Sequence, residues 1–235
     1  MTAFLAELVG TALLVTLGNG VVANVVLDKT KGNNSGFMAI TIGWAMAVFI
    51  GVYASASSSG AHLNPAVTIA LAVIGKFEWA LVPIYLLAQL LGAILGALMV
   101  WIMYRAHFNA TGNADAQRAA FCNTPAIRST PQNFATEFFA TMVFMLAILL
   151  LTKSSNSLGS LDALPVGLLV LAIGLSLGGP TGYAINPARD FGPRIVHALL
   201  PIQGKGGSDW AYSWIPVVAP IAGAVAAALL FNCLN

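Results

Sequence analysis

Long apolar segments separated by polar breaks dominate the pattern of residues along the chain. A helix that crosses a bilayer needs about 20 predominantly apolar residues, and six segments approach or exceed that length. They are residues 3–27, 37–56, 79–104, 133–152, 160–178 and 211–233. The pattern therefore predicts an all-α membrane protein with six transmembrane helices.

Two further apolar stretches, residues 64–75 and 186–199, are too short to cross a bilayer, and each begins with Asn-Pro-Ala. Asparagine is a strong N-cap, and proline is favoured at the first helical position because the N–H that it lacks would be unpaired there. We therefore predict two re-entrant half-helices that begin inside the membrane. Taken alone, either motif could equally be an ordinary capped helix start.

The two halves of the chain repeat each other. Glu7 and Glu137 stand at the start of the first span of each half, and GAHLNPA at 60–66 matches GYAINPA at 182–188. Each half holds three spans, an odd number, so the second copy must enter the membrane inverted. Inverted repeats with broken helices place a functional site near the midplane.

These patterns predict one transmembrane domain rather than several. The expected boundaries are residues 1–235 for the domain, about 3–104 for the first repeat, about 132–233 for the second and about 105–131 for a solvated polar connecting loop.

Composition supports a membrane protein and adds little else. Hydrophobic residues make up 58% of the chain and charged residues 8%, with a mean hydropathy of +0.85, whereas soluble domains carry roughly 25% charged residues. The net charge of +2 is small and the basic residues are scattered along the chain, so there is no reason to expect nucleic-acid binding. Cys122 and Cys233 suggest neither a disulfide framework nor a metal site. The first ten residues lack a basic region, so we interpret them as part of the first span rather than as a cleaved signal peptide.

The half-helices have an electrostatic consequence if their N-termini face each other. Each N-terminus carries about +0.5 elementary charge, and two of them at the membrane centre oppose protons and cations while leaving neutral molecules almost unaffected. The side-chain amides of Asn64 and Asn186 are hydrogen-bond donors at the same place.

The sequences SGAHLNPAVT and GYAINPARDFGPR around the two boxes resemble those of the major intrinsic protein family, the aquaporins and aquaglyceroporins, over essentially the whole chain. The boxes themselves are Asn64, Pro65, Ala66, Asn186, Pro187 and Ala188. The resemblance implies six spans and two half-helices with one pore in each subunit. It also implies a homotetramer in the lipid bilayer of the plasma membrane, with cytoplasmic termini and no cofactor.

The same resemblance places an outer constriction, or selectivity filter, at Trp44, Gly174, Tyr183 and Arg189. Family members selective for water carry histidine where Gly174 stands, so glycine implies a wider pore. Two aromatic walls and a fork of arginine donors match the two edges of a polyol. Glycerol facilitators commonly carry phenylalanine where Tyr183 stands, and this departure leaves the ratio of glycerol to water open.

Other residues resemble the glycerol-facilitator subgroup, namely Asp190, Arg194, Pro216 and Val217. Asp190 and Arg194 are also four apart on a helix, so a simple i,i+4 ion pair of about 0.2–0.5 kcal/mol is the alternative. His62, two residues before Asn64, is expected either to line the pore or to form a hydrogen bond within its own loop.

Glu7 and Glu137 are acids inside spans, which are functional candidates by default. One reading is a proton relay, and the other is that each carboxylate accepts hydrogen bonds from the loop that leads to its half-helix. The resemblance favours the second. His107 and His197 are expected at the surface or at loop ends, without the spacing of metal ligands.

The function implied by these features is a passive channel for glycerol and other small neutral solutes, with water, that excludes protons and ions and is not an enzyme. The first alternative is a mainly water-selective channel, for which Tyr183 would have to close the space left by Gly174. The second is an ion-coupled transporter, against which the lack of paired carboxylates at the midplane argues.

The distribution of basic residues conflicts with the orientation that the resemblance implies. Cytoplasmic loops carry an excess of lysine and arginine in most membrane proteins. With cytoplasmic termini, only Lys76 and Lys153 lie inside. The basic residues outside are Lys29, Lys31, Arg105, Arg118, Arg128 and Lys205.

Overall fold

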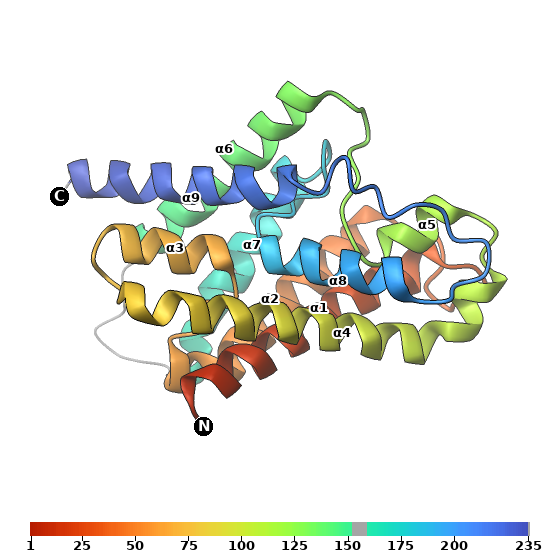
Figure 1. Cartoon of the computed structure of the whole chain (residues 1–235), viewed down its shortest axis with the longest axis horizontal. Coiled ribbons are helices and arrows are strands. Elements are labelled where there is room, and N and C mark those ends of the chain that lie inside the picture. Colours follow the sequence, from red (N-terminus) through yellow and green to blue (C-terminus); the bar gives the residue numbers. More distant parts are fainter. Residues whose placement is uncertain (152–158, 235) are drawn as a thin grey trace.

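The computed structural model describes residues 1–151 and 159–234, which form helices, turns and loops without a strand. The all-α prediction is confirmed. In the described part of the chain, five helices are long and apolar enough to cross a membrane. Most of them run roughly along the long axis of the molecule, and both termini lie at the same end (Figure 1). The five helices are α1 (Ala3–Val26), α2 (Phe37–Ser59), α4 (Val82–Ala110, preceded by the 3-10 turn Trp79–Leu81), α6 (Thr130–Leu150) and α9 (Ile215–Leu234).

The predicted span at 160–178 differs from the other five because its α-helix, α7, covers only Leu164–Leu177. A 3-10 segment, Gly159–Ala163, precedes it, and Pro165 stands in the first turn, where proline is tolerated. At 1.5 Å per α-helical and 2.0 Å per 3-10 residue, the two pieces extend about 30 Å, enough for a hydrocarbon core. The polar break before them, with Lys153, lies outside the described residues.

The two half-helices are α3 (Pro65–Val73) and α8 (Pro187–Leu199), as the Asn-Pro-Ala boxes predict. Asn64 caps the first, since its Oδ1 accepts a hydrogen bond from the N–H of Ala66 at 2.9 Å. Asn186 caps the second through the N–H of Ala188 at 3.1 Å. Within the bundle α3 lies towards the end that holds the termini and α8 towards the opposite end (Figure 1).

Matching glycines show how the two repeats pack. Helix α1 packs against α4, and α6 packs against α9. A Cβ atom on Gly92 of α4 would overlap the carbonyl oxygen of Leu8, and one on Gly223 of α9 would overlap that of Phe138. Glycine lets the backbones approach this closely. Because Glu7 and Glu137 directly precede these two carbonyl residues, the same contact recurs in both halves.

The connecting segment at 105–131 is more ordered than the solvated loop predicted. Helix α4 continues to Ala110 and a short helix, α5 (Ala114–Ala119), follows. Phe108 and Phe121 are fully buried, with ring centroids 5.2 Å apart. The two N–H groups of Gln117 Nε2 are shared among three carbonyl oxygens, those of Phe108, Thr111 and Gln203, at 2.8, 2.9 and 3.0 Å. Part of this segment therefore forms a packed cap over one end of the bundle, which the Gln117 side chain helps to close, while other residues of the segment remain exposed.

Candidate functional site

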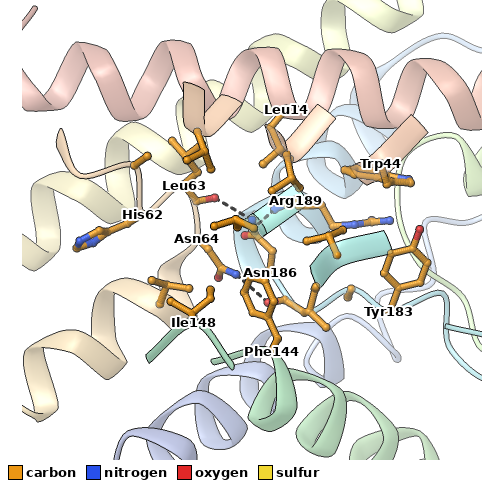
Figure 2. Close-up of a pocket in the computed structure, with 18 of the residues that line it drawn as sticks. Leu14, Trp44, His62, Leu63, Asn64, Phe144, Ile148, Tyr183, Asn186 and Arg189 are labelled. Carbon is orange, nitrogen blue, oxygen red and sulfur yellow. Dashed lines mark hydrogen bonds between the residues drawn. The ribbon is translucent and has the colours of Figure 1, made fainter. Parts of the chain in front are cut away.

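Two cavities meet inside the bundle. The inner cavity, of about 220 Å³, lies beside Asn64 and Asn186 (Figure 2), and the outer cavity, of about 360 Å³, lies beside the segment after α5. Three side chains line both of them: Trp44, Tyr183 and Arg189. These three therefore form the boundary that a solute has to pass between one cavity and the other.

The two Asn-Pro-Ala boxes are tied to each other across the centre of the molecule. Asn64 donates through Nδ2 to the carbonyl oxygen of Ile185 at 2.9 Å, and Asn186 donates to that of Leu63 at 2.8 Å (Figure 2). Each asparagine thus caps its own half-helix and holds the loop of the other. The two positive helix ends are fixed face to face, as expected from the sequence.

The loops that lead to the half-helices have a strained backbone with the same pattern in both repeats. Ala61 and Leu63 have φ values of 52° and 49°, and Tyr183 and Ile185 have 42° and 44°. A residue other than glycine in this left-handed region costs about 1–3 kcal/mol and persists only when its surroundings hold it there. Both loops line the inner cavity.

Glu7 is the group that holds the first loop. Its Oε1 accepts hydrogen bonds from Ser59 Oγ at 2.6 Å and from the N–H of His62 at 2.9 Å. Its Oε2 accepts from the N–H of Leu63 at 2.7 Å and from Gln89 Nε2 at 2.8 Å. Four donors stabilise this buried carboxylate.

Glu137 does the same for the second loop. It accepts hydrogen bonds from Thr181 Oγ1 at 2.6 Å, from the N–H of Ala184 at 3.0 Å and from the N–H of Ile185 at 3.1 Å. Neither glutamate lines either cavity. The contacts agree with the scaffolding alternative and give no path for a proton relay through these two acids.

Sequence reasoning missed the hydroxyl groups that support both glutamates. Ser59 and Thr181 precede Asn64 and Asn186 by the same number of residues, and each donates to the glutamate of its own repeat. A hydroxyl at the matching position of both repeats is a signal that could have identified them.

His62 combines the two roles left open by the sequence, because it lines the inner cavity and also bonds within its own repeat. Its Nδ1 lies 3.1 Å from Thr68 Oγ1. The Thr68 hydroxyl donates to the carbonyl oxygen of Asn64 and accepts from Gln89 Nε2. With the one hydroxyl hydrogen of Thr68 directed to Asn64, we expect Nδ1 of His62 to donate to Thr68 Oγ1 and Nε2 to be the acceptor in the neutral ring.

Arg189 stands in the first turn of α8, and its guanidinium carbon lies 4.4 Å from the centroid of the Trp44 ring. Only 8% of the residue is exposed. Its guanidinium makes no hydrogen bond to any residue in the described part of the chain. A buried guanidinium has five N–H donors, and these remain available to a molecule at the boundary between the cavities.

Gly174 acts differently from the expectation that it simply widens the passage, because it lines neither cavity. A Cβ atom there would lie 2.9 Å from Cζ of Tyr183 and 3.1 Å from its Oη, and one on Gly178 would lie 2.9 Å from Tyr183 Cε1. The tyrosine ring therefore occupies the space left by Gly174 on α7 and by Gly178 directly after it. The Tyr183 and Phe37 rings form a T-shaped pair with a centroid distance of 6.2 Å.

The prediction of a simple i,i+4 pair between Asp190 and Arg194 was incomplete, since both side chains are fully buried. Arg194 donates to Asp190 Oδ1 through Nε at 2.9 Å and Nη2 at 2.7 Å. It also donates to the carbonyl oxygens of Asn123, Ser208 and Asp209. The pair therefore holds two loops, one at Asn123 and one at Ser208–Asp209, against α8 at the residues that follow Arg189.

Three further sequence expectations concern residues away from the boundary. His197 is fully buried rather than at the surface, because its Nδ1 lies 2.8 Å from Ser208 Oγ and its ring packs on Phe121. Pro216 and Val217 lie in the first turn of α9 and line neither cavity.

An apolar bundle with two half-helices that meet beside two cavities with shared lining residues has the architecture of a membrane channel. The family model described as "Major intrinsic protein" matches residues 1–231. The chain belongs to the major intrinsic protein family.

Curated relatives align along nearly the whole chain. A probable glycerol uptake facilitator protein of Thermotoga maritima is 54% identical over 234 residues, covering 100% of both chains. The glycerol uptake facilitator protein of Bacillus subtilis is 47% identical, over 99% of this chain and 84% of its own. The D/L-lactic acid transporter of Lactiplantibacillus plantarum is 40% identical, over 95% and 94%.

A solved structure has the same fold. The aquaglyceroporin from Plasmodium falciparum superposes with a TM-score of 0.86 at 34% sequence identity, over 97% of this chain and 94% of its own.

Proposed function

We propose that this protein is a passive membrane channel for glycerol and other small neutral solutes, with water as a second permeant, and that it excludes protons and ions. The observation that carries the proposal is the set of three side chains, Trp44, Tyr183 and Arg189, that two cavities share. The names of the relatives support glycerol as the solute. The family consists of channels, and the protein is not an enzyme.

Selection of a polyol follows from the chemistry at this boundary. The rings of Trp44 and Tyr183 offer apolar contact to the CH groups of a polyol, and the guanidinium of Arg189 offers donors to its hydroxyl oxygens. Further along the inner cavity, Nε2 of His62 accepts a hydrogen bond. A cation meets the charge of Arg189 and the positive ends of α3 and α8, which oppose its passage.

Stopped-flow light scattering of proteoliposomes under a glycerol gradient tests the proposal. We expect solute-driven reswelling much faster than in empty liposomes of the same lipid, and a rate that rises in proportion to the gradient. Imposed sodium or proton gradients should leave the rate unchanged, because solute flux through a passive channel is not coupled to ion movement. A glycerol flux equal to that of empty liposomes would refute the proposal.

A mainly water-selective channel is the second candidate, favoured by the position of Tyr183. The Tyr183 ring fills the space beside Gly174, so the passage is narrower than the missing side chain of Gly174 by itself would make it. This candidate requires a high water flux with little glycerol flux in the same vesicles. If the tyrosine hydroxyl causes it, Tyr183→Phe must raise the permeability ratio of glycerol to water, whereas an unchanged ratio would exclude that role.

The assembly and orientation that we propose are a homotetramer in the plasma membrane with cytoplasmic termini. The exposure of large apolar side chains along the spans, for example 65% for Met38 and 67% for Ile102, supports contact with lipid or with neighbouring subunits. Chemical cross-linking in native membranes, followed by mass analysis, should give a ladder that ends at four chains. Protease access to a tag at the C-terminus in spheroplasts and in inverted vesicles tests the orientation.

A further inference from the structure

Asn123 forms an unusual set of contacts in the segment between α5 and α6. Its backbone N–H donates to Asp190 Oδ2 at 2.7 Å, and its carbonyl oxygen accepts from Arg194 Nη2 at 2.9 Å. Its side-chain Nδ2 donates to the carbonyl oxygen of Thr181 at 2.9 Å. The residue is buried, with 6% of its surface exposed. One residue thus engages two distant parts of the chain at once.

Those two parts carry the side chains at the boundary between the cavities. Asp190 directly follows Arg189 on α8, and Thr181 precedes Tyr183 by two residues. Asn123 therefore bridges the segment that bears the cation and the segment that bears the aromatic ring.

The approach of the Asn123 amide depends on the residue next to Thr181. A Cβ atom on Gly182 would lie 2.8 Å from Asn123 Nδ2, and Gly182 has a φ of 78°, which side-chain-bearing residues rarely adopt. A second bond joins the same two stretches, from the N–H of Ala126 to the carbonyl oxygen of Pro180 at 2.9 Å. The connecting segment runs along the turn that precedes Tyr183.

We propose that Asn123 is a positioning residue for solute selection. This inference rests on the proposed function, because it assigns the passage between Tyr183 and Arg189 as the selective one. The backbone of Asn123 is fixed to α8 by the ion pair, and its amide holds the Thr181–Tyr183 turn at a set distance from that anchor. The width of the passage is thereby set by a residue on the connecting segment that belongs to neither repeat.

The cost of losing the amide falls on the turn rather than on α8. Thr181 is 1% exposed and lines the outer cavity together with Asn123, and its carbonyl oxygen would lose its hydrogen-bond partner in that side chain. The backbone bonds of residue 123 to Asp190 and Arg194 do not need the side chain and remain. We therefore expect the turn that carries Tyr183 to move until the Thr181 carbonyl oxygen finds another hydrogen-bond donor, whereas Arg189 stays in place.

The experiment uses Asn123→Ala and Asn123→Asp in the full-length channel in proteoliposomes. The aspartate variant has nearly the same volume but lacks the N–H donor. Asn133→Ala is the matched control, because Asn133 is also a buried asparagine of this region and binds Ser129 N–H and the Ile127 carbonyl oxygen, away from Tyr183. Permeabilities for water, glycerol and the longer polyol erythritol are measured on one preparation. Their ratios do not depend on how much protein was incorporated.

We expect both Asn123 variants to change the erythritol-to-glycerol ratio by at least about threefold, a change in relative barrier height of about 0.65 kcal/mol. The control should leave the ratio unchanged even if it lowers thermal stability. Wild-type ratios in both Asn123 variants would overturn the proposal, as would an equal change in Asn133→Ala. Failure of both Asn123 variants to insert would also overturn it, since Asn123 would then be a determinant of folding. Absence of glycerol flux in the wild type would instead refute the proposed function.

Discussion

At the scale of single residues, the position of the Tyr183 ring depends on the absence of a side chain at Gly174. A Cβ atom there would overlap Thr41 Cγ2 and lie 2.9 Å from Tyr183 Cζ. We expect Gly174→Ala to push the ring towards Trp44 and Arg189, and to cost about 1–3 kcal/mol through overpacking. Glycerol permeability should fall more than water permeability in stopped-flow measurements. Gly112→Ala is the control, because a Cβ atom there meets nothing within 4 Å, and an unchanged ratio in Gly174→Ala would contradict this account.

The tautomer of His62 is a second prediction for a single residue. Because the Thr68 hydroxyl donates to the Asn64 carbonyl oxygen, we expect Nδ1 of His62 to carry the ring proton. Nε2 of His62 should then give the ¹⁵N shift of an unprotonated ring nitrogen in solid-state NMR of histidine-labelled proteoliposomes. The chain has three histidines, so His62 and His107 are substituted one at a time to assign the signals. Thr68→Val removes the acceptor, and we expect the Nδ1–H form to lose its dominance. A wild-type signal from Nε2–H would contradict the hydrogen-bond scheme.

Cys122 gives a prediction about pH and reactivity. Burial, with a smaller effect of the Asp190 charge, raises the pKa of the Cys122 thiol to about 12. The thiolate is the reactive form, so its fraction stays very small at neutral pH and rises only as the pH approaches 12. Maleimide at neutral pH should therefore label each folded chain once, at the exposed Cys233, and twice after unfolding. Labelling of folded Cys233→Ser would show that Cys122 is accessible and reactive.

At the scale of elements, each half-helix depends on the loop before it, and each loop depends on one carboxylate. Glu7 accepts four hydrogen bonds and Glu137 three. A glutamine in either place has only one acceptor atom and brings N–H groups against donors. We expect each substitution to cost about 1–3 kcal/mol for every donor left unpaired, with Glu7→Gln the more damaging. Thermal inactivation in detergent measures the order, and equal stability of both variants and the wild type would exclude the scaffolding role.

The elements could be predicted from sequence where their signals are local. An apolar run of about 20 residues needs no partner to be recognised, and Asn64 and Asn186 cap their helices through groups two residues away. The connecting segment could not be predicted in this way. Asn123 is separated from Asp190 by 67 residues and Gln117 from Gln203 by 86. Pairings over such distances leave no periodic pattern in the residues that form them. For the same reason the contact between the Tyr183 ring and Gly174 of α7 could not be predicted.

At the scale of the whole molecule, three of the six basic residues that the proposed orientation places outside, Lys205, Arg128 and Arg118, have structural partners. Lys205 Nζ donates to three carbonyl oxygens at the C-terminal end of α8, where a cation complements the helix dipole. Arg128 pairs with Asp209, and Arg118 pairs with Asp115. These cations are used to close the end of the bundle that holds α5. Their number therefore reports on that closure, and it weighs less as a signal for orientation.

The two halves of the molecule are similar in scaffold and different in charge, and the buried pair of Asp190 and Arg194 marks the difference. Where α8 carries Asp190, the matching position of α3 is Thr68, and Val67 matches Arg189. Removing one partner of a buried ion pair typically costs about 3–5 kcal/mol, because it leaves an uncompensated charge. We expect Asp190→Asn and Arg194→Met each to lower the thermal midpoint strongly.

The double variant shows how far this pair stabilises the whole assembly rather than itself. Removing both charges relieves the unpaired charge, so Asp190→Asn with Arg194→Met should be more stable than the Arg194→Met variant alone. It should still fall below the wild type, because Arg194 also donates to the carbonyl oxygens of Asn123, Ser208 and Asp209, and no other donor replaces it. A thermal double-mutant cycle with the purified channel measures the coupling. A double variant with the thermal midpoint of the wild type would contradict this account, because the two loops would then stay packed on α8 without the hydrogen bonds of Arg194.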